Sequence, residues 1–331
     1  MRAFVITKYK DELREADVPE PTVGEQDILV QVAAAGVNQL DEKIRLGEFR
    51  QILPYTLPLT LGHDVAGTVI RVGSKVHGFT PGDEVYARPR DGRIGSFAER
   101  IAIDEADVAQ KPASLTASEA ASLPLVALTA WQALVERGKL QPGQKVLIHA
   151  GAGGVGSVAI QLAKHLGATV ATTASGANAD FVRGLGADVV IDYRHQDFEK
   201  ELSGYDLVLD SLGGDNLKKS LRVLRPGGKA IGISGPPDPA FARAAGLNPL
   251  LRVAIAALSS SIRREAKKLG VSYEFLLMHA SGDQLRTISA LIDTGALRPI
   301  VGKTFPFEDT PQALASLAQG GIRGKVVITN V

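Results

Sequence analysis

Short apolar runs and longer helical patterns alternate through the middle of this chain. Each run has the length and composition of a buried strand, and helix-compatible segments lie between the runs. A strand, a helix and another strand about every 20 residues is typical of a parallel sheet with crossover helices. The runs are Val146–Ile148, Thr169–Thr173, Val189–Asp192, Leu207–Asp210 and Lys229–Ile233, the helical segments include Asp180–Gly184 and Asn216–Leu224, and Pro226–Gly228 predicts a break before the last run.

The turn after the first run carries a glycine pattern. Gly151, Gly153 and Gly156 form G-x-G-x-x-G between the strand and the next helix, which permits a tight turn and a close approach of the backbone to a pyrophosphate. The free N–H groups and positive dipole end of that helix favour phosphates. A ligand-free glycine turn is the alternative, but the parallel-sheet context favours a dinucleotide site that also includes Gly154 and Val155. The apolar stripe of the helix consists of Val155, Val158, Ala159, Leu162, Ala163 and Leu166.

The first third of the chain has a different pattern. Short β-type runs broken by glycine, proline and aspartate predict an antiparallel β-rich unit. The segment Ser114–Glu136 predicts a helix, with Ser118 and Glu119 suited to its start. The apolar run Gly324–Val331 is too short to be independent and is predicted to return to the β-rich unit. The early runs are Phe4–Ile6, Ile28–Val32, Val65–Val72, Glu84–Tyr86 and Phe97–Ile103.

The bulk composition is that of an ordinary globular protein. The chain has 331 residues, which suggests two domains, with 45% hydrophobic and 22% charged residues. A net charge of +1 gives no reason to expect a nucleic-acid or membrane partner. The absence of cysteine excludes disulfides, thiolate nucleophiles and metal sites built on cysteine. Since Met1–Thr7 lacks the features of a signal peptide, we expect a cytoplasmic location.

Six short motifs follow one another along the chain. They are Gly36–Asn38 with Asp41, Gly62–Asp64 with Gly67, Pro81–Val85, Leu128–Ala130, the Gly151–Gly156 loop and Gly324–Val327. In this order they resemble the medium-chain dehydrogenase/reductase superfamily, and within it the zinc-independent branch of quinone oxidoreductases and enone or alkenal reductases. The resemblance implies an α/β fold, in which a GroES-like β-rich catalytic domain accompanies a Rossmann domain with a doubly wound parallel sheet.

The resemblance also implies a domain division and an assembly. The catalytic domain is expected at residues 1–124 and 300–331, and the Rossmann NAD(P)-binding domain at residues 125–299. A homodimer is expected through the edge of the Rossmann sheet, where we place Tyr273–Met278.

The zinc ligands of related dehydrogenases are incomplete in this chain. Zinc-dependent relatives use a cysteine, a histidine and a second cysteine or an acid, and Asn38 stands where the first cysteine would be. His63 keeps the histidine position, but a catalytic zinc needs three protein ligands. We therefore expect no metal. A metal held by His63 with Asp41 and Asp64 is the alternative to a histidine that lines the site or supports the loop.

The lack of zinc ligands favours a particular acceptor. Without a Lewis acid, an electron-poor C=C beside a carbonyl, or a quinone, accepts hydride more easily than an alcohol gives it up. The resulting negative charge needs hydrogen-bond donors and a proton source, for which Asn38, Asp41 and Lys43 are the catalytic candidates. Quinone oxidoreductases often have tyrosine at the position of Lys43, which therefore either stabilises an enolate or is solvated beside Asp41 and Glu42. Asn38 in turn either acts in catalysis or fixes a loop.

The segment after the second run favours NADPH as the cofactor. NAD enzymes of this fold carry an acid about 20 residues beyond the loop, whereas Thr172–Ser175 is followed by no acid before Asp180. Ser175, Tyr193 and Arg194 are candidate contacts to a 2′-phosphate, with an ordinary exposed loop as the alternative for the last two. By family position, Thr129 is expected at the nicotinamide end. The remaining cofactor candidates are Thr173, Leu212, Gly213, Ile233, Ser234 and Lys325.

The segment Pro236–Gly270 has a helical pattern with a basic end. Its apolar stretch Leu250–Leu258 is interrupted by Arg252 and is too short to span a bilayer. We interpret the segment as a cover over the substrate. Peripheral membrane contact through residues 250–268 is the alternative.

The sequence thus predicts a cytoplasmic, homodimeric, NADPH-dependent oxidoreductase. It would transfer hydride to quinones or to the C=C of α,β-unsaturated carbonyls, without zinc. Reduction of enoyl thioesters uses the same chemistry and is the first alternative. A non-enzymatic NADPH-binding protein that senses redox state or binds RNA is the second, although no basic–aromatic pattern supports RNA binding.

Overall fold

A computed structural model describes residues 1–330 and divides the chain into two compact units. One unit contains Met1–Leu128 and the chain from His279 onward, and the other is Thr129–Met278. Val331, the last residue of the predicted C-terminal strand, lies outside the described residues. Residues 279–299, which the sequence analysis placed in the Rossmann domain, lie with the β-rich unit in this division. There the hydroxyl of Tyr86 donates to the carbonyl oxygen of Leu285 at 2.7 Å.

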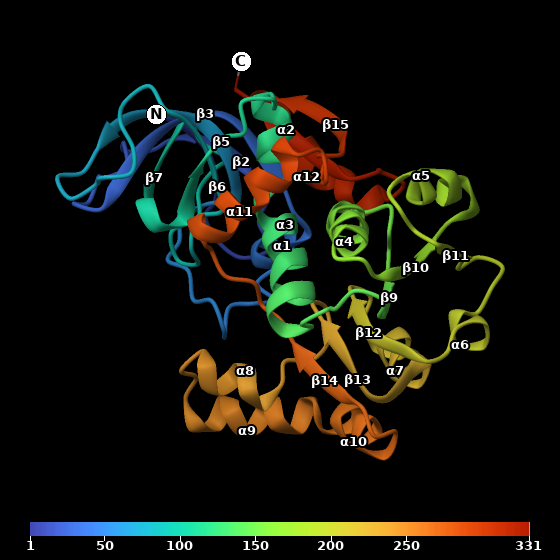
Figure 1. Ribbon diagram of the computed structural model, residues 1–331. Coiled ribbons are helices and arrows are strands. Elements are labelled where there is room, and N and C mark those ends of the chain that lie inside the picture. Colours follow the sequence, from blue (N-terminus) through green and yellow to red (C-terminus); the bar gives the residue numbers. More distant parts are fainter. Residues whose placement is uncertain (331) are drawn as a thin grey trace. The chain divides into compact units, whose positions relative to one another are not determined.

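The second unit is built on a six-stranded parallel sheet with the strand order β11-β10-β9-β12-β13-β14 (Figure 1). The order runs outward in both directions from β9 and β12, which is the doubly wound arrangement expected from the sequence. The strands are β9 (Lys145–Ile148), β10 (Thr169–Ala174), β11 (Val189–Asp192), β12 (Tyr205–Asp210), β13 (Leu224–Gly232) and β14 (Ser272–Phe275).

Helices cover this sheet between successive strands. In α4 the predicted apolar positions Val158, Ala159, Leu162 and Ala163 are buried, because they recur on one face of the helix. The helices of the unit are α4 (Gly154–His165), α5 (Ala179–Gly184), α6 (Phe198–Glu201), α7 (Gly214–Val223), α8 (Pro239–Ala244), α9 (Pro249–Leu258) and α10 (Ser260–Lys268), with the 3₁₀ turn η3 (Gly176–Asn178).

The predicted break before the last strand run falls inside β13. Leu224 already pairs with Tyr205, whereas the next paired residue is Lys229, opposite Leu207. Gly227 between them has φ +81°, so the Pro-Gly-Gly segment bulges out of the ladder rather than preceding the strand. The strand β13 therefore begins at Leu224, before the bulge, and not after it as predicted.

The first unit has a seven-stranded sheet and a separate three-stranded sheet (Figure 1). Most neighbours are antiparallel, as the sequence predicts, and the C-terminal strand β16 returns to pair antiparallel with β3. The strands are β1 (Arg2–Ile6), β2 (Arg14–Asp17), β3 (Asp27–Val37), β4 (Leu59–Thr60), β5 (Asp64–Val72), β6 (Glu84–Ala87), β7 (Arg100–Asp104), β8 (Val108–Gln110), β15 (Val301–Pro306) and β16 (Lys325–Thr329).

The predicted helix Ser114–Glu136 is divided in the structure. Thr116 caps its first part, where its hydroxyl accepts from the N–H of Glu119. Pro124 then begins a second helix, since a proline has no N–H to continue the first. The helical elements of this region and of the first unit are α1 (Gln39–Arg45), η1 (Glu105–Asp107), α2 (Ala117–Ala121), α3 (Pro124–Trp131), the π-helix η2 (Gln132–Arg137), α11 (Gly282–Asp293), η4 (Phe307–Asp309) and α12 (Thr310–Gln319).

Candidate active site

The carboxyl ends of the parallel strands carry the predicted cofactor residues of the second unit. The strands β9 and β12 are neighbours in the sheet. After β9 the chain continues to β10 on one side of this pair, whereas after β12 it continues to β13 on the other side. Ligands of open α/β sheets bind at this reversal point. The loop after β9 contains the glycine pattern, and the loops after β10, β11, β12 and β13 contain Ser175, Tyr193–Arg194, Leu212–Gly213 and Ile233–Ser234.

Two glycines of the loop are required because the turn packs too closely against the chain for a side chain. A Cβ added to Gly151 would lie 2.1 Å from Thr172 Oγ1, and one added to Gly156 would lie 2.3 Å from the carbonyl oxygen of Ala150. The helix α4 starts at Gly154 and has no acid in its first turn, so its positive end is not neutralised. These features fit the diphosphate of a dinucleotide cofactor.

A buried polar network holds the start of this loop. His149 Nδ1 lies 3.1 Å from Thr173 Oγ1, and His149 Nε2 lies 2.9 Å from Ser220 Oγ. Thr173 Oγ1 also accepts from the N–H of Ala150, while Ser220 donates to Asp210 Oδ2 at 3.3 Å. Burial lowers the pKa of His149 to about 4, so the imidazole is neutral near pH 7. Burial also raises the pKa of Asp210, against the opposing effect of two backbone N–H donors.

The adenosine end predicted from the sequence gathers on two neighbouring strands. Ala174 of β10 pairs with Asp192 of β11, which brings Ser175 and Tyr193–Arg194 to the same edge. Ser175 is buried, whereas the side chain of Tyr193 is exposed. The sequence analysis missed Asp192: its carboxylate lies next to Gly176 and accepts from the N–H of Arg194 at 3.1 Å. Asp192 thus places a carboxylate beside the segment that directly follows β10.

The other predicted cofactor residues of this unit have varied surroundings. Leu212 is exposed after β12, and the N–H of Gly213 donates to Asp210 Oδ1 at 2.7 Å. The N–H of Ile233 donates to the carbonyl oxygen of Asp210 at 2.9 Å, which holds the two loops together. Thr129 is buried on α3. Their contacts with a cofactor stay predictions.

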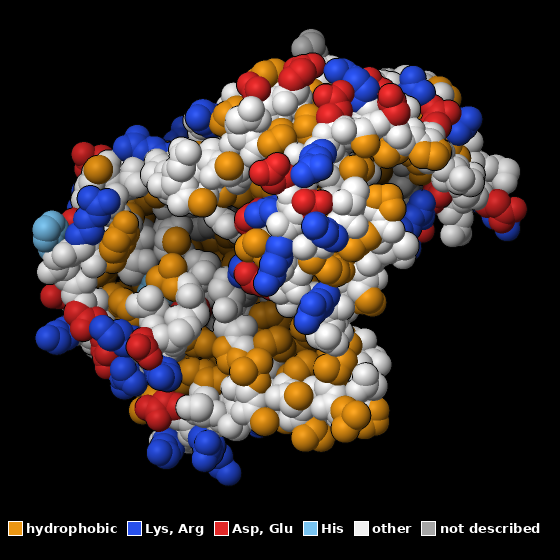
Figure 2. Space-filling model, turned by 180° about the vertical axis from the view of Figure 1, so that it is seen from behind, with side chains coloured by type: hydrophobic (Ala, Val, Ile, Leu, Met, Phe, Trp, Pro, Cys, Tyr) orange, Lys and Arg blue, Asp and Glu red, His pale blue; other side chains and the backbone are white. Residues whose placement is uncertain are grey.

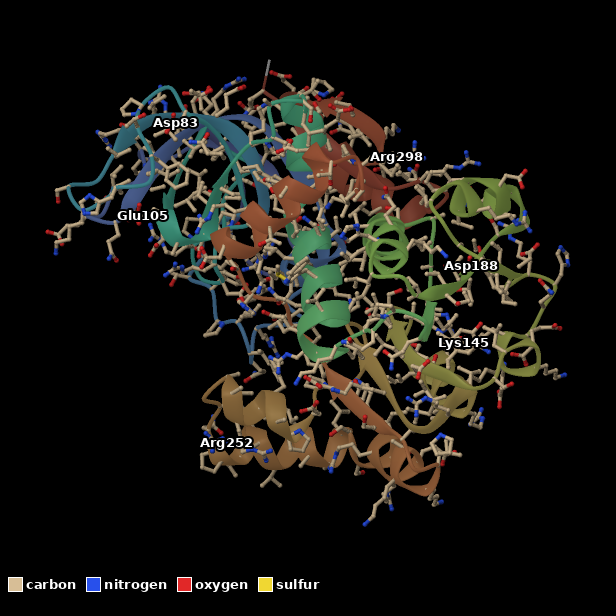
Figure 3. All side chains as sticks on the ribbon, in the orientation of Figure 1. Asp83, Glu105, Lys145, Asp188, Arg252 and Arg298 are labelled. Atoms are coloured by element: carbon tan, nitrogen blue, oxygen red, sulfur yellow. The ribbon has the colours of Figure 1, made fainter. Side chains whose placement is uncertain are left out.

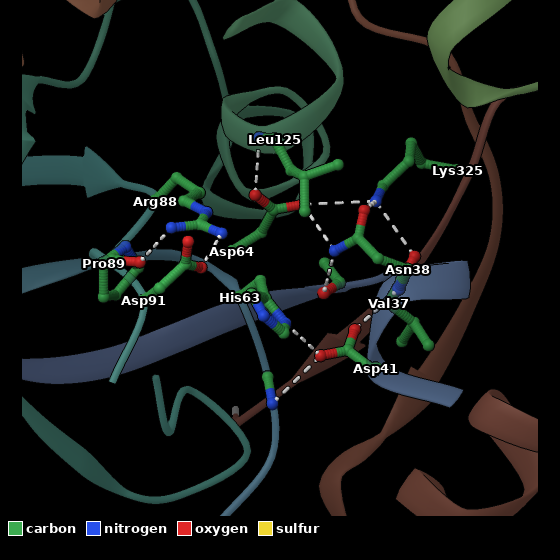
Figure 4. A network of polar contacts seen from close by, with 12 residues as sticks. Val37, Asn38, Asp41, His63, Asp64, Arg88, Pro89, Asp91, Leu125 and Lys325 are labelled. Atoms are coloured by element: carbon green, nitrogen blue, oxygen red, sulfur yellow. Dashed lines mark hydrogen bonds and ion pairs between the residues drawn. The ribbon is translucent and has the colours of Figure 1, made fainter. Parts of the chain in front are cut away.

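The candidate catalytic residues of the first unit lie in a second buried network (Figure 4). Asp41, on α1, accepts from the N–H of Asn38 at 2.8 Å and from the N–H of Gly62 at 3.2 Å. His63 Nδ1 donates to Asp41 Oδ1 at 2.6 Å, and both side chains are fully buried. Asp41 therefore fixes the start of α1 and the turn before β5. His63 Nε2 has no hydrogen-bond partner within residues 1–330.

An ion pair completes this network (Figure 4). Asp64 Oδ2 lies 3.2 Å from Lys325 Nζ and accepts from Asn38 Nδ2 at 2.9 Å, while Asp64 Oδ1 accepts from the N–H of Leu125 at 2.7 Å. Lys325 also donates to the carbonyl oxygen of Val37 and to Asn38 Oδ1. All three N–H donors of this ammonium thus have protein acceptors, and a cofactor contact would have to displace one. The cofactor role of Lys325 and the catalytic role of Asn38 stay predictions.

Lys43 has no such partners. It lies half-buried on α1, and its ammonium forms no hydrogen bond or ion pair with any residue of the described chain. The two acids expected to neutralise it are engaged elsewhere: Asp41 with His63, and Glu42 with Arg45 through two hydrogen bonds of 2.7 Å. Lys43 therefore has no ion pair with these acids; whether it is solvated or stabilises an enolate stays a prediction.

The metal alternative finds no support in this geometry. Over residues 1–330, no three His, Asp or Glu side chains are placed to hold a metal ion. His63 and Asp41 face each other, whereas Asp64 is directed to Asn38, Lys325 and Leu125. The expectation of a metal-free reaction stays a prediction.

Comparison with known proteins places the chain in a family. Residues 24–113 match the model of the alcohol dehydrogenase GroES-like domain, and residues 185–328 match that of zinc-binding dehydrogenases. The chain is 36% identical to the mitochondrial NAD(P)H oxidoreductase RTN4IP1 of Danio rerio, over 99% of this chain and 91% of that protein. It is 35% identical to the chloroplastic NADPH-dependent alkenal/one oxidoreductase of Arabidopsis thaliana, over 99% and 79% of the two chains.

A solved structure gives the same result. The quinone oxidoreductase of Coxiella burnetii superposes with a TM-score of 0.87 at 31% identity, covering 100% of this chain and 99% of that one. The chain belongs to the medium-chain dehydrogenase/reductase superfamily, in the zinc-independent branch of quinone and enone reductases. It is an oxidoreductase that uses a nicotinamide cofactor, as the resemblance of its motifs implied.

The contacts within the two networks were not identified from the sequence, which named Asp64 only as an alternative metal ligand and Lys325 only as a cofactor candidate. Asp64 and Lys325 are 261 residues apart, and their pairing depends on the return of β16 to β3. Ser220 has no sequence signal, because a serine on a polar helix is ordinary. The available signal is an acid at either end of an apolar strand, since a buried carboxylate requires partners: Asp64 begins β5, and Asp210 ends β12.

Proposed function

We propose that this protein is an NADPH-dependent reductase of quinones or of the C=C bond of α,β-unsaturated carbonyls. The observation that carries the proposal is the likeness along 99% of the chain to an NADPH-dependent alkenal/one oxidoreductase. Likeness along the whole chain to a quinone oxidoreductase supports the same substrate class. These acceptors share an electron-poor bond whose reduction places negative charge on an oxygen.

Lys43 is the side chain best suited to meet that charge. Its ammonium is not neutralised by Asp41 or Glu42, which have other partners. A cation that is half-buried interacts more strongly with a developing oxyanion than one in bulk water. The capping contact between Asn38 and Asp41 fixes the first turn of the short helix that carries Lys43.

The chemistry requires three events on the substrate. A bound reduced nicotinamide supplies a hydride. The β-carbon of an enone gains this hydride, and the electron pair of the C=C bond moves to leave an enolate, whose oxygen Lys43 stabilises. A proton then adds to the α-carbon. On this proposal Asn38 and Asp41 position the helix of Lys43 rather than contact the substrate.

Isotope transfer and one substitution test this proposal together. Deuterium from labelled NADPH should appear on the β-carbon of the product, and deuterium from solvent on the α-carbon. Lys43→Met should lower kcat by roughly 10- to 1000-fold with a smaller rise in KM, because the interaction strengthens in the transition state. Mass spectrometry of the product and steady-state kinetics on enones, quinones and enoyl thioesters supply the measurements.

The matched control is Lys8→Met, which removes an exposed lysine of the same unit and should leave kcat unchanged. Label on the carbonyl carbon would instead identify a carbonyl reductase. An unchanged kcat in Lys43→Met would remove Lys43 from the mechanism while leaving the substrate class intact.

NADPH rather than NADH is the second part of the proposal. No acid follows β10 directly, and Ser175, Tyr193 and Arg194 lie at one edge of the sheet. Arg194→Ala should weaken NADPH binding by roughly 1–3 kcal/mol and leave NADH binding nearly unchanged, since only NADPH offers a phosphate for a charge-assisted hydrogen bond. Fluorescence titration measures both affinities, with Arg183→Ala on α5 as the matched control. Equal affinity of the parent protein for the two cofactors would contradict the assignment and would give Asp192 a 2′-hydroxyl to bind.

Homodimer formation and a cytoplasmic location stay predictions. β14 is an edge strand of the described sheet, but the N–H of Phe275 is already taken by Asp238 Oδ2 at 2.8 Å. No helix among the described residues has the length and apolar character to cross a bilayer. Light scattering tests the assembly.

A further inference from the structure

The helix α9 turns an apolar stripe outward. Leu250, Val253 and Leu258 expose 84%, 70% and 65% of their surfaces, and they are three of the seven large hydrophobic side chains exposed within residues 1–330. Ala254 and Ala257 are also exposed and lie on the same face, because positions three and four apart are neighbours on a helix. Figure 2 shows hydrophobic side chains gathered along this lower edge of the second unit.

The local fold explains why this face has no covering. Asn248 accepts from the N–H of Leu251, which starts α9, and Ile255 is the buried residue of the helix. The neighbouring helix α10 is anchored instead, since its Ile262 and Ala266 belong to the core cluster around β14. The helix α10 and one residue of α9 hold this segment on the unit, so the opposite face of α9 remains exposed.

The same segment carries a strong positive charge. Across α9 and α10, residues 249–268, five lysines and arginines against one glutamate give a net charge of +4, whereas the whole chain has +1. Arg264, Lys267 and Lys268 are exposed on α10, the helix that directly follows α9, and Arg252, labelled in Figure 3, is exposed on α9. The single acid, Glu265, lies 3.8 Å from Arg222 and is thus engaged within the unit.

We propose that α9 and α10 form a docking face for the surface of an anionic phospholipid bilayer. In this arrangement α9 lies in the interface plane with Leu250, Val253 and Leu258 at the boundary of the acyl chains. The cations of α10 meet the lipid phosphates. Exposed apolar residues beside clustered lysines and arginines are the combination that binds such surfaces.

Charge decides against a second copy as the occupant of this face. A two-fold contact through α9 and α10 would bring two segments of +4 together, and the face offers no free acid to pair with the facing cations. Anionic lipid supplies the missing negative charge. This inference is independent of the proposed substrate, because it uses none of the residues assigned to the reaction.

Vesicle flotation of the full-length protein provides the test. The protein should bind vesicles that contain phosphatidylglycerol, bind pure phosphatidylcholine vesicles at least about tenfold more weakly, and dissociate as salt is raised. The double variant Leu250→Asp with Val253→Asp should lower the partition coefficient on anionic vesicles by at least about tenfold. The triple variant Arg264→Ala with Lys267→Ala and Lys268→Ala should remove the preference for anionic lipid.

Ile70→Asp is the matched control, because Ile70 is 41% exposed on β5 of the other unit. It should leave vesicle binding unchanged, and all variants should keep the parent circular dichroism, melting temperature and NADPH affinity. Absence of binding to anionic vesicles would overturn the proposal, as would equal binding by the parent and the double variant. Light scattering covers the remaining outcome: a dimer that the double variant dissociates would assign the face to a second copy.

Discussion

The two units each bury a polar network beside a strand end, but they handle charge in opposite ways. In the first unit the carboxylate of Asp64 is fully buried and is compensated by Lys325, Asn38 and a backbone N–H. In the second unit His149 is equally buried, yet its hydrogen-bond partners are the hydroxyls of Thr173 and Ser220, and the carboxylate of Asp210 lies 4.0 Å from its Nε2. Burial drives its pKa down to about 4, so that it carries no charge.

The difference follows from what each group can do when water is removed. A buried ion pair depends on both partners, because either one alone is an uncompensated charge. An imidazole can release its proton and remain a hydrogen-bonding group. The first network should therefore be sensitive to the loss of a partner, and the second to pH.

Removal of Lys325 should have the largest effect. Lys325→Met leaves the carboxylate of Asp64 buried without its counter-charge, which should cost about 3–5 kcal/mol in the free energy of unfolding. Urea denaturation measures this loss.

The control for Lys325→Met is Lys164→Met in the second unit. Lys164 binds Asp188, labelled in Figure 3, at 2.9 Å, and both side chains are more than a third exposed. Loss of that surface pair should cost less than about 1 kcal/mol. Similar losses in the two variants would contradict the view that burial makes the first network critical.

His149 should make stability depend on pH over a defined window. Its pKa is about 4 in the folded protein and 6.5 in the reference state, so the unfolded chain binds more protons between these values. The stability it contributes is present above pH 6.5 and is lost as pH falls toward 4, by about 3 kcal/mol in total. Denaturation at several pH values should show this slope in the parent protein and a smaller one in His149→Gln.

Asp210 has the opposite effect on the pH dependence of stability, since burial raises its pKa. It is present in both the parent protein and His149→Gln, so it does not affect the comparison. If His149→Gln retained the full slope, the loss of stability at low pH would have to come from other groups. The interpretation of His149 as a buried neutral imidazole would then fail.

Removal of one hydroxyl should have the smallest effect. Thr173→Val takes the acceptor from the N–H of Ala150 and the partner from His149 Nδ1, which should cost roughly 1–3 kcal/mol. NADPH affinity should fall with it, because Ala150 precedes the glycine loop. Thr173→Ser restores the hydroxyl and should recover both quantities. A serine variant as weak as the valine variant would assign the effect to packing.

Much of the fold could be predicted because its signals are local. The apolar runs became β9 to β13, and the stripe of Val158, Ala159, Leu162 and Ala163 became the buried face of α4. The glycine loop was found in the same way, since its three glycines and the flanking elements lie within a few residues. Errors occurred where a neighbour in space mattered, as at β13, whose first residue Leu224 pairs with Tyr205 before the bulge.

The polar networks could not be predicted, because each joins residues that the chain keeps far apart. Asn38 and Lys43 were chosen from their positions in a motif, yet the engagement of Asn38 by Asp64 and Lys325 follows from the pairing of β3 with β5 and β16. The free ammonium of Lys43 likewise depends on Glu42 turning to Arg45 and Asp41 turning to His63. Periodicity and glycine spacing specify backbone elements from neighbouring residues alone. Which charges are compensated and which remain available depends on distances through space, and these exist only once the strands have paired.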